Sequence, residues 1–591
     1  MTSIDEIFQK SGHSAGKRKL DPVRDPNEIY KSAKYTTNGS SRHAQVEDDN
    51  EQVDDAEAGP APPPEDDDYG PSLPEEEEDG DDEEGRFFGG GITTQEKEIL
   101  DFMDTNDLTA DDAGPETIDA SWLKKSSLAF EKKISKNAEL RAKFENDPAK
   151  FIESEADLDA AIKALSILSD HPSLYKLFAS LGCAGSLVSL LAHENTDIAI
   201  DAVEIISELT DQDVAASEEE WSSLVDALLE ADLLSLLVSN FSRLDEANSE
   251  ADRSGVYHAL SVLENLASQP STAETLGKDT PLLQWLLSRA QRQEKPIGQN
   301  KQYSAELLAI LVQDSAPNRE ALIKLNAIDT LLQLIAPYRK RDPDKSNPDE
   351  EEFVENVFDT LTLLVTPLKG KEEFVKAEGV ELCLIMLKEG GKKVTQPKAL
   401  RLLNYAALNS LGSGLCEKIV EAGGLKPIFT LFSKKSDSVT IEHLVGIFGS
   451  MLRYLPGDTP ERIRALAKFV EKDYEKIGKL VQLRREYAAK VKQVDEQFAD
   501  QLASGEEDDE WFSRRLDAGF SVLQTIEVIL AWLIAEDDGA KKKIQTLLAD
   551  RDETLADLGK AIQAQIEGIN TTTEEGKDTQ EMLSTLVKFL E

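Results

Sequence analysis

The fold is decided by the stretch "FVKAEGVELCLIMLKE", residues 374–389. It reads as a short helix, a turn at a glycine and a second helix whose apolar residues recur at i, i+3, i+4 and i+7, the spacing of one helix face. The same pattern recurs in "FASLGCAGSLVSLLAH" (178–193), "LIKLNAIDTLLQLIAP" (322–337) and "IVEAGGLKPIFTLFSK" (419–434), with weaker copies at 228–240 and 274–288. Such a unit cannot cover its own apolar stripe, so the pattern predicts a stack of repeats.

The period indicates armadillo or HEAT repeats, and three helices per unit with a small residue at the bend favour the armadillo class. The residues after each turn align at spacings of 49, 46, 49, 52 and 45, and they are Ala184, Leu233, Asp279, Ile328, Val380 and Leu425. Each unit ends in a third apolar helix, for example "GVYHALSVLENLASQ" (255–269). A period in the high forties lies at the upper edge of armadillo and HEAT repeats, and loops such as 338–352 take the surplus. The expected fold is therefore all-α, an armadillo/HEAT-type right-handed superhelical solenoid with three helices per unit.

The chain is expected to divide into a tail, two caps and a stack. Residues 1–91 read as a disordered tail, basic and then acidic, because they lack the apolar content to form a core. Residues 92–165 read as an N-terminal helical cap and half-repeat, 166–455 as about six armadillo-like repeats, and 456–591 as a C-terminal helical cap. A long charged helix over 460–503 is expected to cap the stack. Homo-oligomer formation through the C-terminal helices is the alternative role.

The glycines Gly89 to Gly91 mark the boundary between tail and body. A phosphate loop would need a lysine and a hydroxyl just after them, and Ile92-Thr93-Thr94 follows instead. Thr93 and Glu96 fit a capping box at the start of a helix. We therefore expect a hinge there, and leave open whether Phe87 and Phe88 pack on the body.

The net charge and its distribution along the chain indicate which class of macromolecule the protein binds. The net charge is −49; residues 1–46 carry +3 and residues 47–84 carry −20, which leaves −32 on residues 85–591. An acidic body repels a phosphate backbone, so we expect no direct nucleic-acid binding and favour basic protein segments as ligands. The cluster Lys17, Arg18 and Lys19 is a candidate nuclear localisation signal, or alternatively a solvated charge run.

The sequence offers little for catalysis. The three cysteines lie far apart and the six histidines are dispersed without metal-ligand spacing. No nucleophile elbow or kinase signature is present. The longest apolar run, 521–534, is interrupted by Gln524 and Glu527, which indicates a buried helix rather than a membrane span. We therefore expect no enzyme, no cofactor, no metal and no membrane association.

A polar position recurs on the third helices, just before a core leucine or alanine. It is occupied by Glu208, Asn265, Gln313 and Asn404, and Glu264 lies beside the second of them. Such a ladder fits hydrogen bonding to the backbone of an extended peptide, while the acids attract its lysines and arginines. The alternative, that these are simply polar solvent-facing positions, remains open.

Several strings resemble the beta-catenin-like protein 1 family of nuclear, spliceosome-associated armadillo-repeat proteins. They are "FEKKISKNAELRAKF", "PAKFIESEADLDAAI", "LLAHENTDIAIDAVEIISELTD", "LLQWLL", "ELLAILVQD" and "RRLDAGFSVLQ". The resemblance implies a non-enzymatic scaffold of pre-mRNA splicing in the nucleus, associated with the nineteen complex. It also implies binding to basic localisation-type segments of splicing factors, including the Myb-like subunit of that complex. No local motif marks the peptide-binding residues.

An importin-alpha-like transport adaptor is the alternative function. That receptor family places a tryptophan four residues before the groove asparagine, whereas Ser261 precedes Asn265 and Leu400 precedes Asn404 here. The tryptophan array is missing, so we favour the scaffold.

Overall fold

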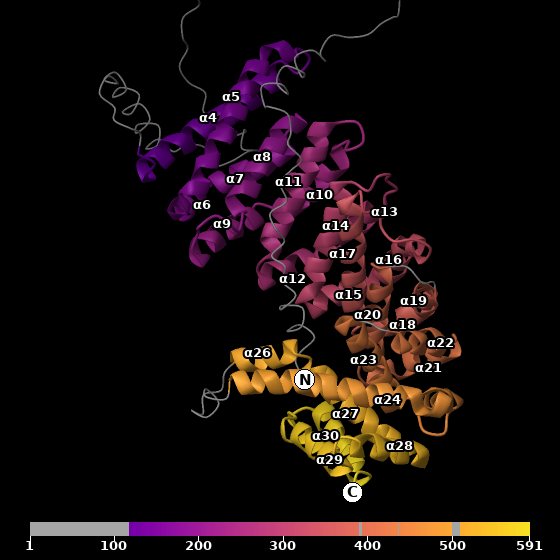
Figure 1. Ribbon diagram of the computed structural model, residues 1–591. Helices are drawn as coiled ribbons and strands as arrows, with labels where there is room; N and C mark the ends of the chain where they lie inside the picture. The colour runs from indigo at the N-terminus through magenta and orange to yellow at the C-terminus, as the bar shows by residue number, and fades with distance from the viewer. Residues whose placement is uncertain (1–116, 389–392, 435–436, 499–508) are drawn as a thin grey trace, which may run out of the picture. The chain divides into compact units, whose positions relative to one another are not determined.

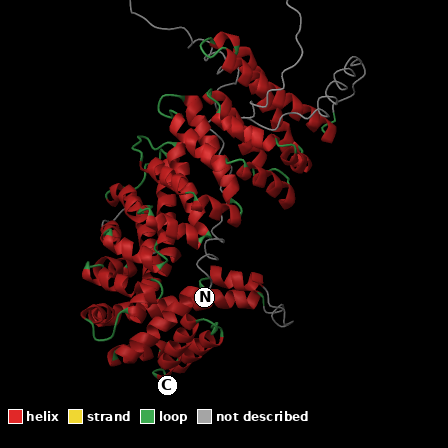
Figure 2. Ribbon diagram, turned by 180° about the vertical axis from the view of Figure 1, so that it is seen from behind, coloured by secondary structure: helices red, strands yellow, loops and turns green. Residues whose placement is uncertain are grey.

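The computed structural model describes residues 117–388, 393–434, 437–498 and 509–591. The described residues belong to one compact unit. The predicted tail, the candidate signal at Lys17–Lys19, the hinge glycines, Phe87, Phe88 and the Thr93 capping box lie outside the described residues. Every regular element in the described ranges is a helix, as Figure 2 shows, and none is a strand.

Six consecutive triplets of helices build the body. They are α6 (Tyr175–Ser180), α7 (Cys183–Ser189) and α8 (Thr196–Thr210); α9 (Glu218–Glu230), α10 (Leu233–Arg243) and α11 (Glu250–Ala267); α12 (Pro270–Lys278), α13 (Thr280–Gln291) and α14 (Gln299–Gln313); α15 (Ala316–Lys324), α16 (Ala327–Ile335) and α17 (Pro348–Leu364); α18 (Leu368–Lys376), α19 (Gly379–Lys388) and α20 (Thr395–Ala407); α21 (Ser413–Glu421), α22 (Leu425–Ser433) and α23 (Ser438–Tyr454). The predicted all-α class and three helices per unit are confirmed.

The third helices of the triplets pack against one another in chain order. Contacts run from α8 to α11, α14, α17, α20 and α23, with α5 (Ile152–Ala164) before the first and α27 (Phe520–Glu536) after the last (Figure 1). More than half of the residues of each third helix are buried, among them Val256, Leu260 and Leu263 of α11. Burying a leucine side chain stabilises by about 1.5–3 kcal/mol, so this layer carries much of the stability of the stack.

A left-handed residue joins the first two helices of five triplets. The positive φ angles are 79° at Gly182, 60° at Asp232, 59° at Asn326, 57° at Glu378 and 76° at Gly423. In the third triplet Asp279 is extended and instead caps α13 by accepting a hydrogen bond from Leu282 N. The turn that the sequence pattern marked is therefore a left-handed one, which glycine and asparagine adopt at the lowest cost.

Substitution of Gly423 isolates the cost of this turn. No atom lies within 4 Å of a Cβ placed at Gly423 or at Gly414, and Gly414 sits inside α21. We expect Gly423→Ala to lower the free energy of unfolding by about 1–2 kcal/mol through the positive φ alone. Gly414→Ala, at a helical φ, should be neutral or raise it by about 0.5–1 kcal/mol. Urea unfolding of the two variants side by side checks this; equal effects would contradict the assignment.

The loop that lengthens the fourth unit is hydrogen-bonded to the fifth unit. The loop between the short 3₁₀ helix Ala336–Arg339 and α17 contains Asp342. Its carboxylate accepts hydrogen bonds from the backbone N–H groups of Lys393 (2.6 Å) and Thr395 (3.1 Å) at the start of α20. The predicted loop at 338–352 thus anchors the fifth triplet, and α17 already begins at Pro348.

The C-terminal part of the body packs around α24 (Pro460–Gln497), with α26 (Asp509–Asp517), α27, α28 (Asp538–Ala549), α29 (Leu555–Glu567) and α30 (Glu574–Lys588). The prediction of one continuous helix from 460 to 503 was wrong. Backbone angles are non-helical from Glu471 to Tyr474, with φ of 55°, 53° and 61° at Lys472, Asp473 and Tyr474. Asp473 pairs with Lys543 at 2.8 Å, and the Tyr474 hydroxyl donates to Asp537 at 3.3 Å, so contacts to α28 and its N-cap hold the break.

Within the described ranges no single helix meets the length and apolarity required to cross a membrane, although two bent pairs pass that test together, Pro172–Ser180 with Cys183–Ala192 and Glu510–Asp517 with Phe520–Glu536.

Candidate peptide-binding face

The exposed edge of α8 carries an acidic stripe. Asn195 caps this helix by accepting a hydrogen bond from Asp197 N at 3.0 Å. After Thr196, every residue of α8 that is not buried is acidic. The acidic stripe comprises Asp197, Asp201, Glu204, Glu208 and, just after the helix, Asp211. Spacings of three and four residues place these carboxylates on one helix face.

A lysine from α5 neutralises part of the stripe. The Lys163 ammonium lies 3.4 Å from Asp201 and also pairs with Asp159, both within the α5–α8 contact. Burial, followed by the hydrogen bond to Asp159, raises the pKa of Asp201 to about 8, although Lys163 opposes the shift. Burial also acts on Asp159, but the hydrogen bonds from Asp201 and Lys163 lower the pKa of that carboxyl. Within this pair the pKa of Asp201 therefore lies above that of Asp159, so Asp159 is the carboxyl that ionises first as pH rises.

This pair predicts that Asp201→Asn stabilises the protein at high pH. The pKa of Asp201 is raised in the folded state from 3.8 to about 8, so its ionisation disfavours folding and stability falls as pH rises through that window. Asparagine keeps a neutral hydrogen-bonding group and cannot ionise. Melting curves should show a higher Tm for the variant at about pH 8 and a gap that shrinks towards about pH 4. The exposed Asp226→Asn on α9 is the control. A variant less stable than the wild type across this range would contradict the assignment.

The neighbouring helix α11 adds a histidine and an acid to this face. His258 Nε2 lies 3.9 Å from Glu204. Burial lowers the pKa of His258, although Glu204 and Glu208 favour its protonated form. Glu264 is half-buried and accepts a hydrogen bond from the Tyr303 hydroxyl of α14. The acidic surface therefore continues from α8 onto α11.

The predicted ladder residues divide into two groups. Glu208 is exposed, while Glu264 and Gln313 are half-buried. Asn265 and Asn404 are only 7% and 8% exposed, so the interpretation of these two as solvent-facing positions was wrong. Third helices are covered by neighbours on both sides, and the packing of those neighbours, not the position before a core residue, decides whether such a polar side chain is buried.

The buried asparagines bond within the stack. Asn265 Nδ2 donates to the Ser207 carbonyl at 3.1 Å and to Thr210 Oγ1 at 3.2 Å, which uses both of its N–H groups. Asn404 Nδ2 lies 3.4 Å from His443 Nδ1, and the Asn404 Oδ1 atom has no hydrogen-bond partner among the described residues. Binding of a peptide backbone by these amides stays a prediction.

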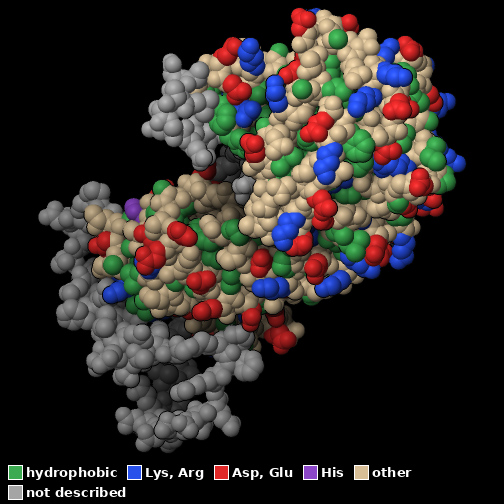
Figure 3. All heavy atoms as spheres, turned by 90° about the horizontal axis from the view of Figure 1, so that it is seen from below, with side chains coloured by type: hydrophobic (Ala, Val, Ile, Leu, Met, Phe, Trp, Pro, Cys, Tyr) green, Lys and Arg blue, Asp and Glu red, His purple; other side chains and the backbone are tan. Residues whose placement is uncertain are grey.

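Charge is balanced further along the stack. On α17 and α20, Glu355 pairs with Lys398 at 2.6 Å and Asp359 pairs with Arg401. A different face, the underside of the molecule as drawn in Figure 1, also carries acidic and basic side chains interspersed (Figure 3). Glu208, by contrast, has no ion pair among the described residues. Unbalanced negative charge on the third helices is therefore concentrated on α8 and α11.

The described residues show no cluster that could hold a metal ion, and their cysteines are not poised to react. Cys183, Cys383 and Cys416 are buried and unpaired. Burial raises the pKa of Cys416 to about 12, which disfavours the thiolate. No group of three or more His, Cys, Asp and Glu side chains in the described ranges could hold a metal ion.

The stripe could have been found from the sequence. The string "TDIAIDAVEIISELTD" (196–211) places its acids at i, i+4, i+7, i+11 and i+14, the spacing of one helix face. The partners Asp159 and Lys163 come from another element, and no local spacing connects them to α8.

Comparison with known proteins identifies similar chains. The family model described as catenin-beta-like, Arm-motif containing nuclear matches residues 97–563. A beta-catenin-like protein 1 homolog from Schizosaccharomyces pombe is 39% identical over 488 residues, covering 82% of this chain and 85% of that protein. Human beta-catenin-like protein 1 is 39% identical over 434 residues, covering 70% and 76%. A designed armadillo repeat protein matches 52% of this chain and 100% of its own, at 14% identity and a TM-score of 0.33.

Proposed function

Because the chain belongs to the catenin-beta-like family of nuclear proteins with armadillo motifs, we propose that it is a non-enzymatic scaffold of pre-mRNA splicing that binds basic segments of splicing factors. The acidic stripe on α8 carries this proposal. It presents carboxylates in a row on a helix whose remaining surface is buried. An extended segment rich in lysine and arginine has the complementary charge and repeat.

Several contacts have to act together for useful affinity. An exposed ion pair contributes about 0–1 kcal/mol, so a single carboxylate does not define a binding site. The stripe, with Glu264 beside it, offers enough acids for a run of basic residues to engage several at once. Affinity should then fall as salt is added, because exposed charges are screened within about 10 Å at 0.1 M.

The splicing role rests on the resemblance of the chain to its family. The family description places its members in the nucleus, and none of the relatives' names denotes an enzyme. Association with the nineteen complex and its Myb-like subunit is part of the same proposal. The importin-alpha-like alternative would place tryptophans at the positions of Ser261 and Leu400. Ser261 instead accepts a hydrogen bond from Ser207 Oγ at 2.9 Å, and Leu400 is 1% exposed, so the third helices give this alternative no support.

Co-purification from nuclear extract tests the biological part of the proposal. The wild-type chain and a variant with Glu204→Lys and Glu208→Lys are used as baits, followed by quantitative mass spectrometry. We expect splicing factors with basic segments to be enriched on the wild type and depleted on the variant. A wild-type bait that enriches no splicing factor would contradict the splicing role, whatever the outcome with isolated peptides.

A further inference from the structure

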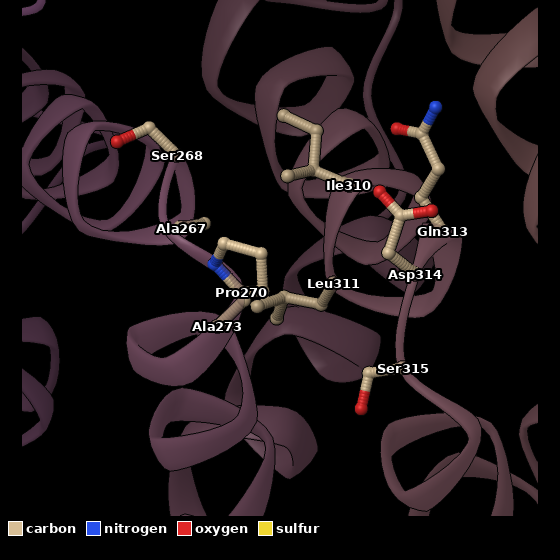
Figure 4. A pocket seen from close by; sticks show the side chains of 9 residues that line it. All are labelled: Ala267, Ser268, Pro270, Ala273, Ile310, Leu311, Gln313, Asp314 and Ser315. Atoms are coloured by element: carbon tan, nitrogen blue, oxygen red, sulfur yellow. The ribbon is translucent and has the colours of Figure 1, made fainter. Parts of the chain in front are cut away.

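A small hollow lies between the second and third triplets, at the C-terminal ends of their third helices. Its volume is about 210 Å³. Ala267, Ser268, Pro270 and Ala273 form one wall, and Ile310, Leu311, Gln313, Asp314 and Ser315 form the other (Figure 4). Pockets for drug-sized ligands measure about 300–1,000 Å³, so this hollow suits a single side chain better than a cofactor.

The backbone around the hollow is already satisfied. Asn318 Nδ2 donates to the carbonyls of Ala273 (2.9 Å) and Leu311 (2.8 Å). Arg319 donates to the carbonyls of Val312 (2.7 Å) and Gln313. Ser315 uses its hydroxyl to cap α15, accepting from Asn318 N at 3.3 Å. The floor therefore offers few unpaired polar groups and is suited to an aliphatic side chain.

The rim of the hollow carries one acidic side chain, Asp314, and begins one turn beyond Glu264 of α11. Ser268 follows Glu264 by four residues, one helical turn further along the same side of α11. On the opposite wall, Asp314 is exposed and has no ion pair among the described residues. A cationic segment lying on Glu208 and Glu264 would meet the hollow next.

We propose that this hollow receives one aliphatic side chain, of the size of leucine, from the same basic segment that the acidic stripe binds. The proposal rests on the proposed function and narrows its ligand: a basic run alone is incomplete, and the preferred segment carries an aliphatic anchor beside its lysines and arginines. Charge supplies attraction along α8 and α11, and the anchor supplies burial of apolar surface.

Peptides that differ by one residue test the anchor. Fluorescein-labelled lysine- and arginine-rich peptides carry a single leucine, placed at successive positions from one peptide to the next, and each has a serine counterpart. Fluorescence anisotropy with the full chain should show one position at which leucine binds about tenfold more tightly than serine.

Two variants that fill the hollow, Ile310→Phe and Ala267→Leu, should abolish this preference while leaving the affinity of the serine peptide unchanged. Ile463→Phe, at a residue of α24 that is 61% exposed, is the matched control and should keep the preference. Melting curves identify any filling variant that has lost its fold. The test of the leucine preference then rests on the other filling variant.

The possible results distinguish the aliphatic anchor from the acidic stripe. A leucine preference that both folded filling variants remove supports the anchor. Serine and leucine peptides that bind equally at every position, or a preference that survives filling, would overturn the anchor and leave the acidic stripe standing. If none of the basic peptides binds, the proposed function fails together with the anchor.

Discussion

Replacing Glu204 and Glu208 by lysine is expected to weaken binding of a lysine- and arginine-rich peptide by about 100-fold, equivalent to about 2.8 kcal/mol. The two substitutions remove two attractive charges from the stripe and add two repulsive ones. Each charge pair at about 4 Å is worth about 1 kcal/mol in water and more near a protein surface. Titration calorimetry at low salt measures the loss, and the difference from the wild type should shrink as salt is raised.

A matched pair of control substitutions distinguishes an effect of the acidic stripe from an effect of the net charge. Asp226 and Glu230 are exposed, lie four residues apart and belong to α9, the first helix of the next triplet. Asp226→Lys with Glu230→Lys changes the total charge by the same amount and is expected to alter affinity less than threefold, roughly 0.6 kcal/mol. Equal losses in the two double variants would mean that the overall field, and not the stripe, governs binding.

Arg289→Met is expected to lower the free energy of unfolding by about 3–5 kcal/mol, because it removes the bidentate partner of the buried Glu246 and leaves only Arg292, which is 45% exposed and lies 3.6 Å from that carboxylate. The side chains of Arg289 and Glu246 are 6% and 8% exposed. Arg289 Nε donates to Glu246 Oε1 at 2.9 Å, and a second nitrogen donates to Oε2 at 2.7 Å. Asn300 of α14 donates to the same carboxylate at 3.2 Å. The group joins the α10–α11 loop to the third triplet, so its loss loosens the stack itself.

Two further variants sharpen this result. Removing both charges, with Arg289→Met and Glu246→Met, should cost less than removing the arginine alone, because the charges that then lose a partner, Glu294 and Arg292, are 22% and 45% exposed and can be solvated. Lys324→Met breaks an exposed pair, Lys324 with Glu320 at 3.9 Å, and should change stability by less than about 0.5 kcal/mol. Urea unfolding of all three is the measurement. A double variant as unstable as Arg289→Met would assign the loss to packing instead of charge.

The repeats could be predicted because their signals are local. Apolar periodicity and the turn between the first two helices recur in every unit, and the aligned residues Leu233 and Leu425 are the first residues of α10 and α22. The break in α24 had no such signal. Lys472, Asp473 and Tyr474 include neither glycine nor proline, and the side chains that hold the break come from the region of α28, more than 60 residues away.

The candidate site was predicted in character but not in detail. An acidic body with a polar third-helix face pointed to basic ligands; Glu208 and, in part, Glu264 have solvent access, and binding by them stays a prediction. Asn265 is buried instead, because which side of a third helix faces solvent depends on the packing of both neighbours. Its bonds to Ser207 and Thr210 mean that Asn265→Ala would loosen the α8–α11 contact, so charge substitutions test the binding face more cleanly.

Photo-crosslinking tests the central claim most directly. A lysine- and arginine-rich peptide that bears a photoreactive side chain is bound to the full chain, and the complex is irradiated. The crosslinked residues are then mapped by mass spectrometry. The acidic face of the third helices predicts crosslinks on α8, α11 and α14 that disappear with Glu204→Lys and Glu208→Lys. Crosslinks confined to the second helices of the triplets or to α24–α30 would contradict it.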